Sequence, residues 1–233
     1  IGKGITQRLA SEGCKVIIFD VLVQELQETV EQFRAEQLDV QGEIVDITNE
    51  EAVQTTIQKA AAANGRLDIM VNCAGIVGET AVNIAEYSTD VFDTIIDINL
   101  KGAFLLTKYA IPFMLQRQYG RILHITSIGG KEGNPGMVGY AASKSGMMGL
   151  VKGVGKEYAE MGITVNGIAP AVIATEMNAD TDPAMLEYMK AKIPMKRLGT
   201  IEEVAALSCW IVSEEASFNT GFVFDLSGGR ATY

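Results

Sequence analysis

The sequence predicts a three-layer, doubly wound α/β fold around a parallel sheet. Strand-like apolar runs alternate with amphipathic helical stretches along the chain, the pattern of a parallel sheet covered by helices on both faces. The chain has 233 residues, of which 48% are hydrophobic and 21% charged. With no internal repeat, low-complexity tract or linker, this composition favours one domain over residues 1–233 with a sizeable core.

Each expected element has a local reason. Residues 15–20 (KVIIFD) have the continuous apolar character of a buried strand. In the next helix Leu26, Val30 and Phe33 are spaced by four and three, which places them on one face. Thr48 or Asn49 can cap the helix that follows. By such arguments we expect strands at residues 15–20, 40–45, 68–71, 121–126, 164–168 and 221–226, and helices at 4–11, 24–36, 50–63, 90–118, 140–161 and 201–212.

Residues 170–200 interrupt this rhythm. They hold three of the five prolines and four methionines, namely Met177, Met185, Met189 and Met195. We interpret the segment as a substrate flap with short helices. The methionines either face the substrate or serve as adaptable core filler, and the sequence leaves both interpretations open.

Composition excludes several classes of protein. A net charge of −10 argues against a nucleic-acid partner. We expect no membrane contact, because the chain lacks an apolar run of about 18 residues. Three widely spaced cysteines and one histidine lack metal-ligand spacing, so no metal site is expected. The cysteines are interpreted as free thiols in the cytoplasm, and His124 as a satisfied core histidine.

Small and polar residues gather where the predicted strands end. Asp20 closes one strand, Asp46 follows another, and the segments 72–75 (NCAG), 126–127 (TS) and 169–170 (AP) follow three more. Parallel sheets of this kind bind ligands beyond the carboxyl ends of their strands. The sequence therefore predicts a ligand site at this edge.

Tyr140 and Lys144 would lie one turn apart on the same helix face. An ammonium beside a phenol favours the phenolate, so Tyr140 could exchange a proton near neutral pH. Ser127, thirteen residues upstream, could hydrogen-bond an oxygen whose charge changes. This chemistry interconverts an alcohol and a carbonyl, although the spacing alone is a common coincidence.

Taken in order, these motifs resemble the short-chain dehydrogenase/reductase family over essentially the whole chain. Asn72-Cys73-Ala74-Gly75 resembles its Asn-Asn-Ala-Gly motif with one asparagine replaced, and the segment 170–175 (PAVIAT) resembles its Pro-Gly-x-x-x-Thr loop with alanine in place of glycine. That replacement requires the loop to avoid a positive φ. The closing segment 225–229 (DLSGG) is also similar.

The family's first glycine-rich turn survives only as Ile1-Gly2. The resemblance thus implies a Rossmann-like fold whose first strand is missing from this chain. The strand's neighbours would then face each other across a gap. We expect about 15–20 residues ahead of Ile1, the length of one strand and its turn.

The resemblance also implies roles for individual residues. Tyr140 would be the acid/base, Ser127 would bind the reacting oxygen, Lys144 would lower the pKa of Tyr140, and Asn99 would position a water beside Lys144. The catalytic set is therefore Asn99, Ser127, Tyr140 and Lys144. The implied cofactor-binding set is Ile1, Gly2, Asp20, Asp46, Ile47, Asn72, Ala74, Gly75, Tyr140, Lys144, Pro170, Ile173 and Thr175.

Asp20 favours NAD over NADP. A carboxylate here accepts hydrogen bonds from ribose hydroxyls and repels a 2′-phosphate, and no arginine flanks it. Asp20 could instead cap the next helix, and Asp46 could be a plain loop cap.

The resemblance implies an NAD-dependent oxidoreductase acting on a small polar substrate, a sugar acid or polyol. Its subgroup would be the dehydrogenases of 2-keto-3-deoxy-L-sugar acids. Lys131 could pair with a substrate carboxylate, or it could be solvated. The alternatives are a 3-oxoacyl-(acyl-carrier-protein) reductase and a non-catalytic dinucleotide-binding scaffold. Helices apolar on more than one face favour a homotetramer, as in the family.

Overall fold

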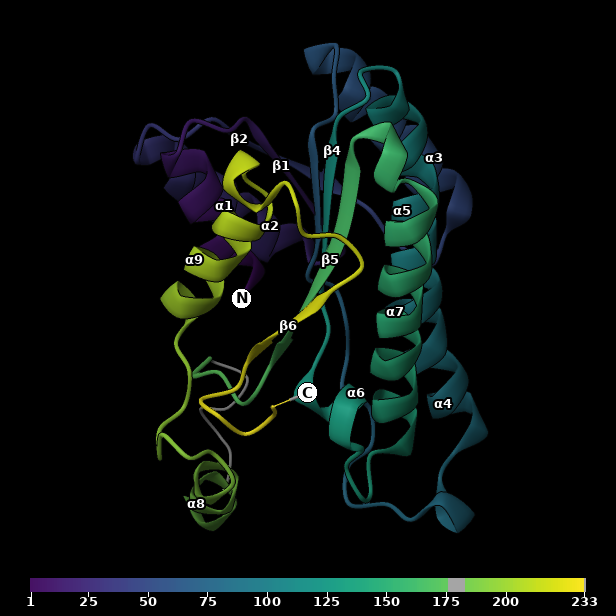
Figure 1. The fold of residues 1–233 in the computed structure, drawn as a ribbon, viewed down its shortest axis with the longest axis vertical. Coiled ribbons are helices and arrows are strands. Elements are labelled where there is room, and N and C mark those ends of the chain that lie inside the picture. Colours follow the sequence, from purple (N-terminus) through teal and green to yellow (C-terminus); the bar gives the residue numbers. More distant parts are fainter. Residues whose placement is uncertain (176–182, 233) are drawn as a thin grey trace.

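The computed structural model describes residues 1–175 and 183–232, and it confirms the doubly wound parallel architecture (Figure 1). The strands run parallel wherever they pair. Their bounds are β1 (Val16–Asp20), β2 (Val40–Ile44), β3 (Ile69–Asn72), β4 (Gly120–Ile125), β5 (Ile163–Pro170) and β6 (Val223–Leu226). Each predicted strand is present, with ends that shift by one or two residues.

Helices cover both faces of the sheet (Figure 1). The elements are α1 (Gly2–Ser11), α2 (Val23–Ala35), α3 (Glu50–Asn64), α4 (Thr89–Ile95), α5 (Gly102–Leu115), α6 (Ile128–Glu132), α7 (Val138–Glu157), α8 (Pro183–Ala191) and α9 (Ile201–Ile211), with short 3₁₀ turns between some of them. No helix in the described part of the chain is long and apolar enough to cross a membrane.

The core has two halves, one on each face of the sheet. On β4, Ile122 packs with the cluster that includes α3 and α5, whereas Leu123 packs with the cluster that includes α1 and α9. Successive residues of a strand point to opposite faces. A strand buried on both sides is therefore apolar at consecutive positions such as Ile122 and Leu123, and every residue of β4 is buried.

Side-chain caps mark the starts of α3, α4, α6 and α9. The side chain of Asn49 accepts a hydrogen bond from the Ala52 amide at 3.1 Å, which confirms it as the cap of α3. Thr200 and Glu203 form a reciprocal capping box at the start of α9. The expected helix at 90–118 is one helical region, but a π-helical segment, Ile96–Lys101, joins α4 to α5.

Two expectations need correction or lie partly outside the structure. No helix was expected between residues 126 and 140, yet α6 forms at Ile128–Glu132 because Ser127 caps it, accepting from the Gly129 amide at 3.1 Å. The expected flap at 170–200 includes the short helix α8. Met177 and residues 176–182 as a whole lie outside the described residues.

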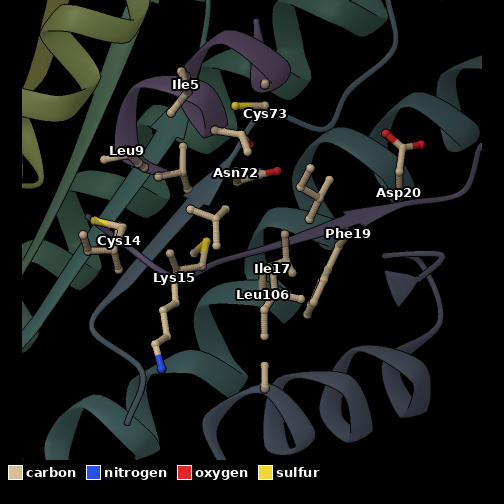
Figure 2. Close-up of a pocket in the computed structure, with 18 of the residues that line it drawn as sticks. Ile5, Leu9, Cys14, Lys15, Ile17, Phe19, Asp20, Asn72, Cys73 and Leu106 are labelled. Carbon is tan, nitrogen blue, oxygen red and sulfur yellow. The ribbon is translucent and has the colours of Figure 1, made fainter. Parts of the chain in front are cut away.

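The strands form two sheets rather than one. The order is β1–β2 in the first sheet and β3–β4–β5–β6 in the second. A cavity of about 820 Å³ separates β1 from β3 and is lined by residues of both strands and of α1 (Figure 2). The expected gap is confirmed, and the length of chain ahead of Ile1 stays a prediction.

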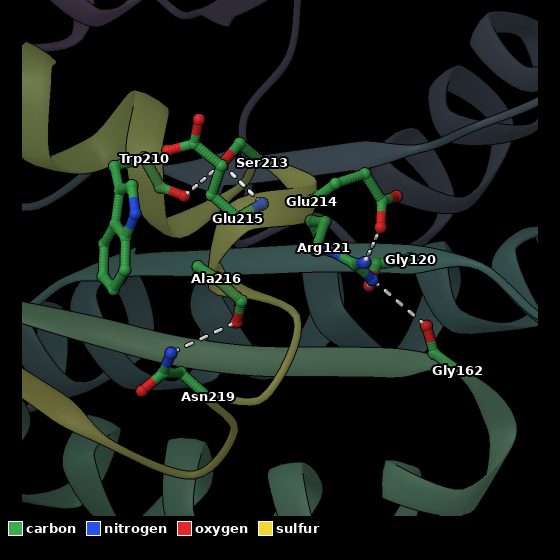
Figure 3. Close-up of polar contacts among 9 residues, drawn as sticks. All are labelled: Gly120, Arg121, Gly162, Trp210, Ser213, Glu214, Glu215, Ala216 and Asn219. Atoms are coloured by element: carbon green, nitrogen blue, oxygen red, sulfur yellow. Dashed lines mark hydrogen bonds and ion pairs between the residues drawn. The ribbon is translucent and has the colours of Figure 1, made fainter.

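A buried arginine closes the opposite, amino end of the second sheet (Figure 3). Arg121 is 4% exposed, and its guanidinium donates to the carbonyls of Gly120 and Gly162 at 2.9 and 3.2 Å. It also pairs with the exposed carboxylate of Glu214 at 3.3 Å and lies 4.4 Å from the ring centroid of Tyr119. This cation ties β4 to the start of β5 and to the segment after α9.

Candidate active site

The carboxyl ends of three adjacent strands bring the predicted polar residues together. Asn72 ends β3, Ser127 follows β4, and Pro170 ends β5. The parallel register pairs Asn72 with His124 and Ile125 with Ile168, so these ends lie side by side. The predicted ligand-binding edge is therefore formed by the fold itself.

Tyr140 and Lys144 face this edge from α7. Ser127 lies near the Tyr140 hydroxyl, close enough to lower its pKa. The Lys144 ammonium donates to the Ile125 carbonyl at 2.9 Å and lies 5.8 Å from the centroid of the Tyr140 ring. The structure thus brings together the three residues that the sequence singled out, with the phenol and the serine hydroxyl half-buried and the amine buried.

Burial is the main cause of the pKa shifts at this site. It lowers the pKa of Lys144 to about 8. Burial also raises the pKa of Tyr140 above its ordinary value, and the neighbouring Ser127 offsets only part of that rise. In this geometry desolvation of the phenol outweighs the nearby amine, and the role of Lys144 in lowering the pKa of Tyr140 stays a prediction.

Asn99 lies at the base of the site in the π-helical segment and is fully buried. Its amide bonds the backbone of Ile76 in both directions, accepting at 2.8 Å and donating at 2.9 Å. The same amide nitrogen donates to Ser143 at 3.0 Å. Asn99 therefore ties the chain after β3 to the catalytic face of α7. Neither Ile76 nor Ser143 was singled out from the sequence.

The turn at residues 72–75 lies between this site and α1. The Asn72 side-chain oxygen accepts from the Ala74 amide at 3.1 Å. A methyl group on Gly75 would lie 3.1 Å from the Asn99 side-chain oxygen and 3.3 Å from the Lys144 nitrogen. Only glycine leaves the surface of this turn clear of both groups. Cys73 packs against Gly2 at the start of α1, 3.4 Å from where a methyl group on that glycine would be.

Comparison with known proteins places this arrangement in a family. A family model described as enoyl-(acyl carrier protein) reductase matches residues 1–231. The 2-dehydro-3-deoxy-L-rhamnonate dehydrogenase (NAD(+)) of Sphingomonas sp. (strain SKA58) is 40% identical over the whole chain and 92% of its own length. The chain belongs to the short-chain dehydrogenase/reductase family. It is an oxidoreductase, which removes the scaffold alternative.

Two further similar proteins are named for different activities. A 3-oxoacyl-(acyl-carrier-protein) reductase of Thermotoga maritima (strain ATCC 43589 / DSM 3109 / JCM 10099 / NBRC 100826 / MSB8) is 34% identical over 98% of this chain and 92% of its own length. The crystal structure of an NAD⁺-bound xylitol dehydrogenase superposes with a TM-score of 0.93 at 27% identity, covering 98% of this chain and 94% of that one. The likeness extends over the whole fold.

The remaining predicted cofactor residues occupy varied environments in this oxidoreductase. Asp20 is exposed at the end of β1 and accepts from the Leu22 amide at 3.0 Å with one oxygen, so it does begin the turn into α2. Asp46 accepts from both the amide and the hydroxyl of Thr48 at 2.9 and 2.7 Å, the contacts of a loop cap. These bonds lower the pKa of the Asp46 carboxyl.

The apolar members of the predicted set are largely buried. Ile47 is 8% exposed and packs against Gly102 of α5. Ile173 is 4% exposed and forms a parallel bridge with Gly199. Pro170 is buried and Thr175 half-buried. Ala171 is absent from the residues with positive φ, as the alanine replacement requires.

Lys131 takes a position that the sequence left open. Its ammonium pairs with Asp225 at 2.8 Å, and the neighbouring Glu132 pairs with Arg230 at 2.6 Å. Both pairs link α6, which Ser127 caps, to the segment at and after β6. The long-range partner explains why sequence reasoning could not find this contact. Of the two alternatives for Lys131, the solvated one is wrong, because its side chain is only 11% exposed. Pairing with a substrate carboxylate stays a prediction, and Asp225 is an internal carboxylate that would compete with it.

Proposed function

We propose that this protein is an NAD-dependent oxidoreductase that interconverts a secondary alcohol and a ketone on a small polar substrate, a sugar acid or polyol. The observation that carries the proposal is the position of Ser127 near the Tyr140 hydroxyl, beside the buried Lys144 that donates to the Ile125 carbonyl. Tyr140 is the acid/base, and it exchanges its hydroxyl proton with the substrate oxygen. Ser127 holds that oxygen by donating its own hydroxyl proton.

Lys144 acts on the site through its charge. With a pKa of about 8, the amine carries a proton at neutral pH, and a buried cation favours negative charge on a nearby oxygen. Asn99 keeps the Lys144 helix in register with the turn after β3, because its amide bonds both Ser143 and Ile76. We also propose that Asn99 orders the expected water beside Lys144.

The residues present fit a dinucleotide. The ten-residue helix α1 begins beside Cys73 of the turn at 72–75, and the positive end of a helix favours a pyrophosphate. Gly75 leaves the surface next to Lys144 clear. Asp20 accepts from Leu22 with one oxygen only, which leaves its other oxygen for a ribose hydroxyl. When bound, NAD supplies the acceptor or donor of the hydride.

The substrate class rests on two likenesses and one structural feature. The relative from Sphingomonas is a dehydrogenase of a deoxy sugar acid, and the structural neighbour is a polyol dehydrogenase. The wall formed by α6 and the residues after it contains polar side chains, including Asn134, whose nitrogen lies next to Gly129. A hydroxylated substrate would find hydrogen-bonding groups there.

The second candidate is a 3-oxoacyl-(acyl-carrier-protein) reductase, which the 34% identity to the Thermotoga protein favours. An acidic carrier protein would need a basic docking surface. The described basic residues near α5 are engaged, since Lys108 pairs with Glu50 at 2.7 Å and Lys101 with Asp97 at 3.4 Å. A net charge of −10 also opposes this partner.

The deciding experiment measures initial rates of NAD and NADP reduction with 2-dehydro-3-deoxy-L-sugar acids and with polyols. The reverse assay follows oxidation of NADH and NADPH with a 3-oxoacyl thioester. We expect turnover with NAD and a member of the first two groups. Turnover restricted to the thioester with NADPH would replace the proposal with the second candidate.

We also propose that the protein is a homotetramer. Phe104 on α5 is 47% exposed, and Phe222 is 56% exposed beside Phe224 and Trp210. Exposed aromatic residues on two separate surfaces fit two kinds of contact between copies. Light scattering at micromolar concentration should give four times the 25.0 kDa chain mass, and a monomer would contradict the proposal.

A further inference from the structure

A chain of polar groups crosses the core beneath the site. Its centre is His124 of β4, which is fully buried. Its Nδ1 lies 3.4 Å from the Asn72 amide nitrogen, and its Nε2 lies 3.1 Å from the Thr107 hydroxyl of α5. Thr107 also donates to the Ala103 carbonyl at 2.8 Å. A histidine inserted between two neighbours at these distances is fixed on both sides.

The bonds at each end determine which ring nitrogen carries the proton. Thr107 has a single hydroxyl proton, and it goes to the Ala103 carbonyl. The Thr107 oxygen must therefore accept from Nε2–H of His124. At the other end, the side-chain oxygen of Asn72 accepts from the Ala74 amide. The side-chain NH₂ group of Asn72 therefore faces the His124 ring. Nδ1 is thus the acceptor, and the ring is the neutral Nε2–H form.

The electrostatics agree with this neutral form. Burial, and to a lesser extent the nearby charge of Lys144, lowers the pKa of His124 to about 3. A protonated ring would place a hydrogen on Nδ1, facing the NH₂ group of Asn72. Two donors would then oppose each other in the core. His124 consequently presents the same acceptor to Asn72 throughout the neutral pH range.

From Asn72 the chain of contacts reaches the catalytic groups. The Asn72 oxygen holds the Ala74 amide at 3.1 Å. The next residue, Gly75, lies directly over the Asn99 oxygen and the Lys144 nitrogen. A rotated Asn72 amide would turn its NH₂ group toward the Ala74 N–H and break this contact. The orientation of one buried amide therefore sets the surface of the turn beside Lys144.

We propose that His124 is a positioning residue, whose Nδ1 orients the Asn72 amide and thereby fixes the turn at residues 72–75 that faces the dinucleotide. The inference rests on the proposed function for the identity of the ligand alone. The positioning itself concerns only groups of this chain. The proposal predicts that the geometry of the turn depends on a hydrogen-bond acceptor at the position of Nδ1 and not on the rest of the imidazole ring.

The single histidine of the chain permits a direct test. In protein labelled with ¹⁵N-histidine, one pair of ring nitrogen signals should report the neutral Nε2–H form at pH 7. The Nδ1–H form or a protonated ring would overturn the proposal, because neither can accept from Asn72. This measurement needs neither a variant nor a cofactor.

Variants test the consequence. Asn in His124→Asn places its oxygen where Nδ1 was and keeps the acceptor, whereas His124→Leu removes it. Amide hydrogen exchange at Ala74 should be about tenfold faster in His124→Leu and near the parent rate in His124→Asn. NADH, titrated by fluorescence, should bind about tenfold more weakly to His124→Leu only. Thr107→Val is the matched control: it removes the acceptor of Nε2–H but leaves the Asn72 NH₂ group facing Nδ1, so Nδ1 stays the acceptor and neither value should change.

The outcomes separate the two proposals. Equal behaviour of His124→Leu and His124→Asn, in either direction, overturns the positioning role. If the parent protein fails to bind NADH, the proposed cofactor fails, while the exchange rate at Ala74 still decides the role of His124. If His124→Leu does not fold, the ring nitrogen signals and the exchange rate in His124→Asn decide it instead, and faster exchange in that variant overturns the proposal.

Discussion

Lowering the pH from 7.0 to 5.5 should destabilise this protein by about 1.2 kcal/mol through His124 alone. The pKa of this histidine is lowered to about 3 in the folded state, against about 6.5 in an unfolded chain. Between these two pKa values His124 binds a proton in the unfolded state but not in the native state. A lowered folded pKa means that the contribution is full above pH 6.5 and is lost as the pH falls toward 3.

The magnitude does not depend on the exact folded pKa. Any value below about 4.5 leaves the native ring neutral at pH 5.5, so the loss follows from the unfolded pKa and the pH alone. Other shifted groups titrate outside this window. The lowered pKa values of the Asp46 and Glu203 carboxyls change the stability below about pH 4.5. The lowered pKa of Lys144, about 8, changes the stability above this window.

Urea unfolding at the two pH values measures the effect. For an m-value of about 2.5 kcal/mol/M, the midpoint should fall by about 0.5 M at pH 5.5. His124→Asn cannot titrate, so its midpoint should stay within about 0.1 M over the same range. An unchanged midpoint in the parent protein, or an equal fall in the variant, would show that His124 is not the buried, neutral group described here.

Three further predictions concern the site and the sheet. Tyr140→Phe should lower kcat by about 10²- to 10⁴-fold, with NADH affinity retained. The control Tyr109→Phe loses only an exposed bond to Glu50 and should keep the parental kcat. Parental kcat in Tyr140→Phe would show that Tyr140 is not the acid/base. Asp20→Ala should reduce the preference for NAD over NADP in kcat/KM about tenfold or more, and an unchanged ratio would contradict a ribose contact. Arg121→Met should cost about 2 kcal/mol of unfolding free energy in urea, because the carbonyl of the buried Gly120 loses its guanidinium donor. Glu214→Gln, at an exposed partner, should cost under about 1 kcal/mol, and equal losses would refute this account of Arg121.

The fold was accessible from the sequence because its signals are local. Apolar runs and spacings by three and four located the strands and most helices, and Asn49 marked the start of α3. The errors occurred where tertiary context decided. Nothing in residues 128–138 showed that Ser127 would cap a helix, and the π-helical insertion at Ile96–Lys101 leaves no signature in the periodicity.

The site was predictable in its members but not in its connections. Strand ends and the Tyr140–Lys144 spacing predicted which edge of the sheet holds the candidate site. The partners of Lys131 and Arg230 are 94 and 98 residues away along the chain, and no local pattern reveals such pairs. His124 was expected to be a satisfied core histidine, and the structure confirms it. No local pattern indicated that one of its partners would be Asn72, which lies 52 residues away along the chain.

Spacing places Lys144 one turn from Tyr140, but it carries no information about how much water each group loses. In the fold the amine bonds the Ile125 carbonyl and lies 5.8 Å from the phenol ring. At that distance its field does not offset the burial of the hydroxyl, whose pKa rises. Ser127 is the group that lowers the pKa of Tyr140 in this geometry. Ser127→Ala should therefore raise the pKa of the phenol further, and the loss of activity on that replacement would combine a lost substrate contact with a less acidic Tyr140.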